Sequence, residues 1–422
     1  MEGASLPRVL AGWRGEGPIG LDEHIAALGP LPLPGSRRRA DLIDEIERSG
    51  LRGRGGAGFP AAMKLRAVAA ARGRPLVVVN AAEGEPASRK DRVLLAGAPH
   101  LVLDGALLAA GAVGAREVIF CVKATSGAAL AAIERAVADR SEGDRIDLSV
   151  VEVPASYVAG EETALVNFLN TGHAIPTFVP PRPFERGVDG RPTLMQNVET
   201  LAQLALIVRH GADWFREIGI AGDPGSSLVS LDGAVARPGV YEIESGTSLS
   251  GLLDAAGGPT NPIQAFLLGG YGGSWVPAAR TSALALGRDG DGGGTLGAGV
   301  VIALPNDACG VCETARVARW LADESAGQCG PCVHGLAAIA GALTEIGDGV
   351  AEPGAHLRVE RWSEDVAGRG ACRHPDGAAQ LVASALFAFA EEVERHEAGE
   401  GCAARRGPPW TLPLIDRAEA AA

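Results

Sequence analysis

The chain has 422 residues, of which 46% are hydrophobic, 21% charged and 4% aromatic, and its formal net charge is −13. This length and composition fit a soluble globular protein of roughly two to four domains and exclude wholesale disorder. The negative charge disfavours nucleic acid and anionic membranes as partners. The sequence has neither a signal-peptide pattern nor an apolar stretch of about 18 residues, so we expect no membrane insertion. We expect a cytoplasmic protein, at most peripheral to a membrane complex.

Residues 1–60 are expected to be irregular, apart from one short helical pattern at Leu42, Ile43 and Ile46 and a glycine run after it. From residue 61 to about 140 the sequence alternates between helical and strand patterns. The predicted strands are 76–79, 117–122 and 148–153, and the predicted helices are 63–71, 93–112 and 127–140. This alternation predicts an α/β layer with a mainly parallel sheet.

The second half of the chain changes character twice. A proline-rich loop at 177–184 and a helix at 198–210 lead into a small α+β unit. Its predicted strands are 227–231, 240–243, 265–268 and 299–304, with a helix at 248–256. Beyond it, apolar residues spaced three and four apart predict the helices of a bundle: Leu336, Ile339, Leu343 and Ile346, then Val382, Leu386, Phe389 and Val393. The last 20 or so residues are expected to form a mobile tail.

A glycine-rich loop is the strongest local feature. Gly53, Gly55, Gly56 and Gly58 crowd together before a helix that carries Lys64. Glycines let backbone amides approach a phosphate or a ring system closely, and a helix N-terminus adds a positive dipole. The alternative is an ordinary flexible loop. No predicted strand immediately precedes the glycines, so the loop is not a dinucleotide fingerprint.

Three further polar segments follow the predicted strands or lead into a helix. One carries Asn80 together with Glu83 and Glu85 at the carboxyl end of a strand, the edge at which open α/β sheets bind ligands. The others are Gly160-Glu161-Glu162, and a polar turn around Asn197 that leads into a helix. Glu161 and Glu162 can equally be ordinary acidic residues at a helix N-terminus.

Four of the seven cysteines form two C-x-x-C pairs, Cys309/Cys312 and Cys329/Cys332, and Cys372 follows 40 residues after the second pair. Such pairs bind zinc, bind an iron–sulfur cluster or cycle as a redox dithiol, and the pattern argues against a disulfide scaffold. Cys121 lies in an apolar strand and is expected in the core. The sequence assigns no role to Cys402.

Taken together, in order and spacing, these motifs resemble the NADH-binding flavoprotein (F-type) subunit of bacterial NADH:quinone oxidoreductase (complex I) and related diaphorase subunits, over residues 50–395. The resemblance implies a Rossmann-like FMN domain (61–222) after an irregular region with the glycine loop (1–60). A ubiquitin-like β-grasp (SLBB-type) domain (223–304), a C-terminal helical bundle with an iron–sulfur site (305–398) and a tail (399–422) follow. The fold class is therefore α/β plus α+β and all-α parts.

The resemblance also implies cofactors and roles. The residues implied to bind FMN are Gly53, Arg54, Gly55, Gly56, Lys64, Asn80, Glu83, Gly160, Glu161, Glu162 and Asn197. Cys329, Cys332 and Cys372 are implied to bind the cluster, and Glu85 and Glu162 are candidates for a catalytic role beside the flavin. In the family, hydride passes from NADH to the flavin, and electrons leave singly through the cluster to other redox subunits.

The sequence departs from the family at the expected nucleotide site. Ala82 replaces an aspartate, Ala67 stands near the position of an aromatic, and Val179 and Arg182 stand where a lysine and a phenylalanine are usual. Losing rings and a cation weakens a stacked nucleotide, because an aromatic pair contributes about 0.5–1.5 kcal/mol beyond its burial. A shift of the loop that brings Phe184 into the site would restore one ring.

The cluster motif departs as well, because Ala326 replaces the first of its three clustered cysteines. The fourth ligand is then open among Cys309, Cys312, His334, His374, Ser325 and solvent, or the site holds a [3Fe-4S] rather than a [4Fe-4S] cluster. A predicted helix at 313–325 separates the Cys309/Cys312 pair from the other cysteines by about 20 Å, since an α-helix rises about 1.5 Å per residue.

Three functions remain open on the sequence alone. The first is an FMN- and iron–sulfur-dependent subunit that oxidises NADH. The second is an electron-transfer flavoprotein of the same fold that uses a ferredoxin-like or other redox partner instead of NADH, which the altered nucleotide positions favour. The third is a non-enzymatic assembly module, which Ala82 and Ala326 together would favour.

Overall fold

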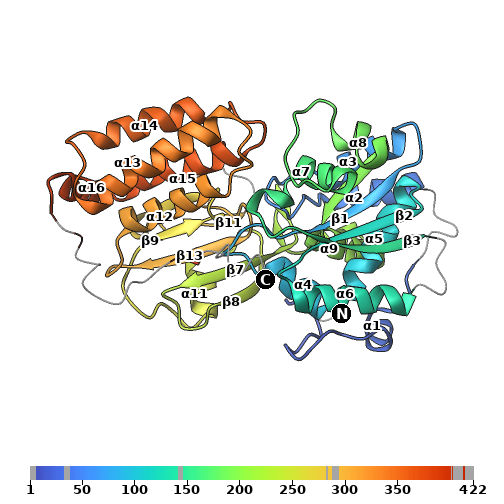
Figure 1. The fold of residues 1–422 in the computed structure, drawn as a ribbon. Coiled ribbons are helices and arrows are strands. Elements are labelled where there is room, and N and C mark those ends of the chain that lie inside the picture. The colour runs from blue at the N-terminus through green and yellow to red at the C-terminus, as the bar shows by residue number, and fades with distance from the viewer. Residues whose placement is uncertain are drawn as a thin grey trace.

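The computed structural model describes residues 6–32, 39–140, 146–281, 284–287, 294–400, 402 and 412–413. Figure 1 shows two halves side by side, each built around one sheet. The first half contains β1–β4 and the helices up to α10. The second contains a sheet formed by β7–β10 and β13, covered on one face by the helices α12–α16 (Figure 1).

The first sheet is parallel throughout, with the strand order β3-β2-β1-β4. Its strands are β1 (Leu76–Ala81), β2 (Glu117–Lys123), β3 (Asp147–Val153) and β4 (Thr193–Asn197). Val77 and Val79 of β1 face one apolar cluster, and Leu76 and Val78 face another. Because both faces of β1 are covered, its sequence is a continuous apolar run, as in other buried parallel strands.

Helices cover both faces of this sheet and support the loops at its edge. They are α1 (Leu21–Leu28), α2 (Arg39–Ser49), α3 (Ala61–Ala70), α4 (Lys90–Gly97), α5 (Pro99–Val113), α6 (Gly127–Arg140), α7 (Glu162–Thr171), α8 (Pro183–Arg186), α9 (Val198–His210) and α10 (Ala212–Arg216). The 3₁₀ turns η1 (Tyr157–Gly160) and η2 (Val188–Gly190) complete this half. The long helices α5 and α9 pack against each other and are almost wholly buried.

Three expectations for this half are corrected. The predicted helix 93–112 is two helices, α4 and α5, because Pro99 cannot continue α4 and instead begins α5. Helix α1 lies in the region expected to be irregular. The polar turn expected before Asn197 contains strand β4, which pairs with β1 and so brings Asn197 beside Asn80.

The second sheet has the order β10-β9-β13-β7-β8. Its strands are β7 (Ser226–Gly233), β8 (Gly239–Glu244), β9 (Ile263–Leu268), β10 (Ser274–Pro277) and β13 (Val300–Pro305), with α11 (Leu249–Ala255) beside them. Phe266 and Val301 face the small core that contains α11, whereas Leu267 and Ile302 face the helical region. Two short ladders, β5 (Gly219–Ile220) with β6 (Asp223–Pro224) and β11 (Leu286–Gly287) with β12 (Gly294–Thr295), lie outside this sheet.

The helical region consists of α12 (Gly310–Asp323), a π-helical turn (Pro331–Leu336), α13 (Ala337–Asp348), α14 (Ala355–Val366), α15 (His374–Ala388) and α16 (Ala390–Glu397). The apolar pattern at 382–393 spans two helices, since the chain bends at Phe389. The predicted tail lies largely outside the described residues, but Leu412 is buried and its backbone N–H donates to Glu313. The predicted fold class is confirmed, while the exact domain limits stay a prediction.

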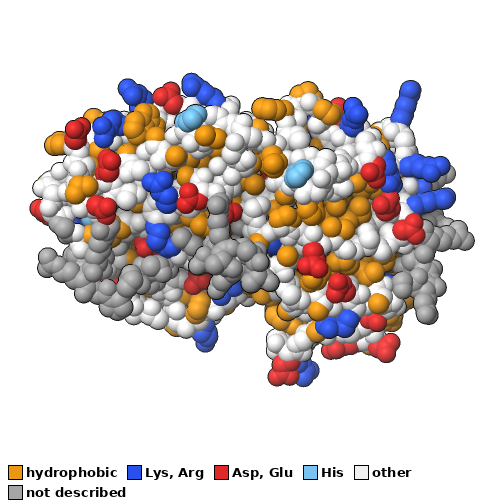
Figure 2. Space-filling model, viewed as in Figure 1, with side chains coloured by type: hydrophobic (Ala, Val, Ile, Leu, Met, Phe, Trp, Pro, Cys, Tyr) orange, Lys and Arg blue, Asp and Glu red, His pale blue; other side chains and the backbone are white. Residues whose placement is uncertain are grey.

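Over the part of the chain that the structure describes, no single helix has the length and apolar character to cross a membrane. Helices α4 and α5 pass that test only as a pair, and they are bent by 96°. On the face in Figure 2, basic and acidic side chains are interspersed rather than gathered into one patch of a single sign.

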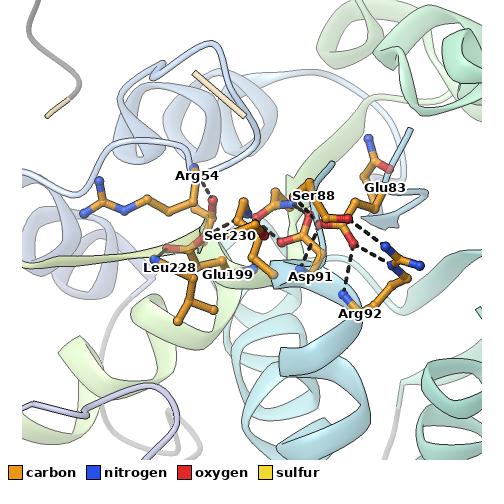
Figure 3. A network of polar contacts seen from close by, with 12 residues as sticks. Arg54, Glu83, Ser88, Asp91, Arg92, Glu199, Leu228 and Ser230 are labelled. Carbon is orange, nitrogen blue, oxygen red and sulfur yellow. Dashed lines mark hydrogen bonds and ion pairs between the residues drawn. The ribbon is translucent and has the colours of Figure 1, made fainter. Parts of the chain in front are cut away.

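A buried ion network joins the two halves. The ammonium of Lys90 lies 2.6 Å from a carboxylate oxygen of Asp91 and 2.8 Å from one of Glu199. The other oxygen of Glu199 accepts the backbone N–H of Leu228 on β7, and the N–H of Arg89 donates to Ser230 on the same strand (Figure 3). Burial opposes the charge on Lys90, but the two carboxylates outweigh it and raise the pKa of Lys90.

We predict that Lys90→Met lowers the free energy of unfolding by about 3–5 kcal/mol, because it leaves the fully buried Glu199 carboxylate without its cation. Denaturant unfolding measures this loss. Lys90→Met/Glu199→Gln should recover part of the stability, since the carboxylate that lost its cation is then neutral.

Arg89→Ala is the matched control, because the Arg89–Asp232 ion pair is partly exposed and should contribute less than about 1 kcal/mol. A loss in Lys90→Met no larger than that of the control would contradict a joining role for Lys90.

Candidate functional site

A large cavity opens at the carboxyl edge of the first sheet, between the two halves. A space of about 750 Å³ adjoins one of about 370 Å³, and the two share Gly55, Asn80, Gly160 and Asn197 in their walls. The combined walls contain all but one of the predicted FMN residues: Gly53, Gly55, Gly56, Lys64, Asn80, Glu83, Gly160, Glu161, Glu162 and Asn197. This volume lies in the range of small-molecule and cofactor sites.

Two glycines allow the backbone segments around this cavity to approach closely. A Cβ on Gly160 would lie 2.3 Å from the carbonyl oxygen of Ala82, and one on Gly84 would lie 2.4 Å from that of Tyr157. Any side chain at either position would push the end of β1 away from η1. The cavity floor therefore requires glycine at both positions.

Several of the predicted polar side chains form hydrogen bonds with neighbouring groups around the cavity. Asn80 donates to the carbonyl of Gly160 at 2.8 Å, and Asn197 donates to Asp91 at 2.6 Å. Glu83 accepts the backbone N–H of Asp91 at 3.1 Å, and Glu161 caps α7. The helix-terminus interpretation of Glu161 is thus confirmed, although its side chain also faces the cavity.

Arg54 is the exception among the predicted cofactor residues. Its side chain is fully buried, with one guanidinium nitrogen 3.3 Å from Asp223 and another 3.3 Å from the carbonyl oxygen of Pro224. Arg54 is not among the residues that line either of the two spaces. The Arg54 side chain therefore fixes the glycine loop to Asp223 and Pro224.

Charged and aromatic side chains lie at the partly exposed mouth of the cavity. Lys64 pairs with Glu162 at 3.1 Å, and the ring of Phe59 lines the wall while remaining 43% exposed. Arg182 lines the same wall, whereas Phe184 packs against the core of the first half. The loop shift that would bring Phe184 into the site is not seen, because its ring packs against that core.

Sequence reasoning missed the walls that come from the second half of the chain. Gly269, Gly272, Gly297 and Ala298 come from the loops of the second sheet, and Tyr271, Leu321, Asp376 and Gly377 add to the other space. Tyr157, which sequence reasoning does not single out, faces both spaces and stacks edge-on against Trp320 at 5.3 Å between ring centroids. No local signal marks such residues, since they reach the cavity only through the packing of the two halves.

The predicted cluster ligands meet beside this cavity. Cys329, Cys332 and Cys372 line one small cavity together with Ala326, and Cys372 also lines the large one. Burial raises the pKa of Cys332 to about 12, and the neighbouring Cys329 and Cys372 add to this shift. Three thiols so placed need a cation to hold them as thiolates, which is what the iron of a cluster provides.

Of the candidates for a fourth ligand, only His374 lines this small cavity among the described residues. Its Nε2 lies 2.8 Å from the carbonyl oxygen of Leu321, so Nε2 carries the proton and Nδ1 keeps its lone pair. Burial lowers the pKa of His374, which keeps the ring neutral. Cys309 and Cys312 lie at the opposite end of α12 and contact other residues.

Family models match the chain in three stretches. A model of the Nuo51 FMN-binding domain matches residues 46–206, one of the SLBB domain matches 228–270, and one of the NADH-ubiquinone oxidoreductase-F iron-sulfur binding region matches 311–396. The three stretches contain the first sheet, part of the second sheet and the helical region in that order.

Similar proteins match over most of the chain. An F subunit of the NADH-quinone oxidoreductase of Rhizobium meliloti is 33% identical over 84% of this chain and 88% of its own. The F subunit of the Streptomyces coelicolor NADH-quinone oxidoreductase is 34% identical over 86% and 84%, respectively. Among solved structures, an air-oxidised NAD⁺-reducing [NiFe]-hydrogenase superposes with a TM-score of 0.81 at 30% identity, covering 96% of this chain and 70% of the hydrogenase chain. The chain therefore belongs to the family of NADH-quinone oxidoreductase F subunits.

Proposed function

We propose that this chain takes hydride from NADH with a bound FMN and passes the electrons one at a time through an iron–sulfur cluster to a partner subunit. One observation carries this proposal: Cys372 lines both the large cavity and the small three-cysteine cavity. A flavin supplies the step between two-electron and one-electron chemistry, so its site needs a one-electron outlet at its wall.

The protein's own residues divide this work. Gly53, Gly55 and Gly56 let the backbone approach the cofactor, and Asn80 and Asn197 fix the two strand ends on which the cavity rests. Cys329, Cys332 and Cys372 hold the cluster. Tyr157 and Leu321 fill the wall of the large cavity and keep water from it.

The mouth of the cavity offers the cations and the aromatic ring that a nicotinamide nucleotide requires, although not all of them stand at the positions usual in the family. Arg182 and Lys64 supply cations for phosphates, and the partly exposed ring of Phe59 supplies a stacking surface. This favours NADH over the alternative of a flavoprotein that exchanges electrons only with a ferredoxin-like partner. The relatives, which are named as parts of NADH-quinone oxidoreductases, favour it too.

Glu85 can hold a proton in this site near neutral pH. Its carboxylate accepts the backbone N–H of Tyr271 at 2.9 Å and lines the smaller space. Burial raises the pKa of Glu85 to about 7, and the backbone hydrogen bonds from Tyr271 and Ala87 only partly oppose the shift. A carboxyl that titrates at neutral pH beside a redox cofactor can exchange the proton that accompanies hydride chemistry.

Anaerobic mixing of the flavin- and cluster-loaded protein with NADH tests the function. We expect the flavin absorbance to bleach with saturable dependence on NADH, followed by an EPR signal from the reduced cluster. Arg182→Ala should raise the NADH concentration for half-maximal bleaching by about tenfold, in line with the loss of one charge-assisted contact of roughly 1.5 kcal/mol. Reduction by a ferredoxin but not by millimolar NADH would overturn the proposal in favour of the alternative.

Glu85→Gln should stabilise the flavin-free protein more at high pH than at low pH. In the parent, unfolding releases the Glu85 proton between about pH 4.5 and 7, so stability falls by about 1.4 kcal/mol per pH unit across that window and the loss is complete above it. The advantage of the variant should grow by about 2–3 kcal/mol from pH 5 to pH 8, as measured by urea unfolding. Glu23→Gln, on the exposed face of α1, is the control.

Ala326→Cys should complete a four-cysteine cluster site, because Ala326 lines the same small cavity as the three cysteines. If the parent holds a [3Fe-4S] cluster, iron per chain should rise from about three to about four and the EPR signal of the oxidised cluster should disappear. If His374 serves as the fourth ligand, the parent already holds four irons, and His374→Ala should lower this number in the parent but not in Ala326→Cys. Unchanged iron content and spectra in Ala326→Cys, in His374→Ala and in the double variant would contradict the placement of the cluster.

A further inference from the structure

A second group of metal-ligating side chains lies in the helical region, away from the flavin cavity. Cys309 precedes the first turn of α12 and Cys312 lies within it; His396 lies at the end of α16, and Cys402 follows six residues later. One ligand atom from each of these four residues lies within 4.8 Å of all the others. Among the described residues, Cys329, Cys332 and Cys372 do not form so tight a group.

Two distances within this group match a single tetrahedral ion. Two sulfurs that each lie about 2.3 Å from a tetrahedral zinc ion are about 3.8 Å apart, and a sulfur and an imidazole nitrogen are about 3.5 Å apart. The Sγ atoms of Cys312 and Cys402 are 3.7 Å apart, and Cys309 Sγ lies 3.4 Å from His396 Nε2. In a [4Fe-4S] or [3Fe-4S] cluster each cysteine binds a different iron, so the cysteine sulfurs lie further apart than the edge of one tetrahedron.

We propose that Cys309, Cys312, His396 and Cys402 bind one zinc ion in a closed structural site that is separate from the electron path. The four protein ligands complete the coordination shell, so no position is left for water or substrate, as is usual for structural rather than catalytic zinc. Binding is not a redox step: the three thiols become thiolates, and their protons pass to solvent.

The surroundings support this assignment. The backbone N–H of Cys312 donates to Cys309 Sγ at 3.3 Å, which orients that sulfur toward the group. Cys309 Sγ also lies 3.3 Å from a carboxylate oxygen of Glu392. Three crowded thiols beside a carboxylate favour a divalent cation, which would neutralise most of the charge that forms when they ionise.

The proposed zinc ion would fasten two ends of the helical region together. It joins the start of α12 to the end of α16 and to the segment that carries Cys402. Helix α12 leads from this site toward the flavin cavity, where Leu321 lines the wall, and its carboxyl end precedes the loop of Cys329. A fixed α12 therefore keeps the cluster loop in position against the flavin domain.

A disulfide between Cys312 and Cys402 is the competing chemistry for these thiols. Their sulfurs lie 3.7 Å apart, well beyond an S–S bond of about 2.05 Å. A disulfide would also not explain why Cys309 and His396 lie in the same group. A zinc site uses all four side chains at once.

The test measures zinc and iron in the same tag-free protein, purified anaerobically with its cofactors and analysed by plasma mass spectrometry. We expect about one zinc per chain in the parent. Cys402→Ser and Cys312→Ser should lower zinc by about tenfold while FMN and iron stay at the parental level. Cys372→Ser should do the reverse, losing iron and retaining zinc, and Cys121→Ala, in the buried strand β2, is the control that retains both.

A second measurement covers the case in which a cysteine variant fails to fold. Replacement of zinc by Co²⁺ in the parent should give the visible bands of tetrahedral cobalt with thiolate ligands, and a chelator that removes the cobalt should free three titratable thiols. A parent with no zinc, or iron bound by these four residues, would overturn the proposal. A disulfide between Cys312 and Cys402 in anaerobically purified protein would overturn it as well. The flavin bleaching described above is a separate readout, so failure of the zinc site and failure of the proposed function can be told apart.

Discussion

The architecture depends on one buried charge. Lys90 is one of only three lysines in the chain, yet its ammonium is almost fully buried between Asp91 and Glu199. Removing a charge from water costs several kcal/mol, so this arrangement persists only where each partner is held by further hydrogen bonds. Glu199 is held by β7 of the second sheet and Asp91 by Asn197 of the first, so the network is complete only when the two halves are packed together.

This constraint explains why the cavity lies where it does. Lys90 and Asp91 form part of its wall together with Asn80 and Asn197 at the strand ends, and Asn197 donates to Asp91. The cavity is therefore not a feature of the first sheet alone, because its opposite wall consists of loops from the second sheet and residues of α12 and α15. A flavin bound there would contact all three regions, and its binding would stabilise their packing by mass action.

The sequence predicts the elements of this fold far better than it predicts their contacts. Apolar runs locate β1, β2 and β3 to within two residues, because buried parallel strands have an unmistakable composition. Strand β4 escapes sequence reasoning because Gln196 and Asn197 give it the composition of a polar turn, although pairing with β1 satisfies its backbone. The contacts of the Arg54 side chain escape sequence reasoning for a related reason: Asp223 and Pro224 lie about 170 residues away, and no local pattern predicts such a pairing.

The cysteines illustrate the same limit in chemical terms. Spacing alone makes the two C-x-x-C pairs equally good candidates for cluster ligands. It therefore suggests that Cys309 or Cys312 could replace the ligand lost at Ala326. In three dimensions α12 separates the pairs: one lies beside the flavin cavity with Cys372, and the other lies with His396 and Cys402. The ligand sets differ in spread as well as in place, one suited to the several irons of a cluster and the other to a single ion. The alanine at position 326 is therefore not compensated by Cys309 or Cys312, and the cluster must either use a ligand other than cysteine or lack one iron.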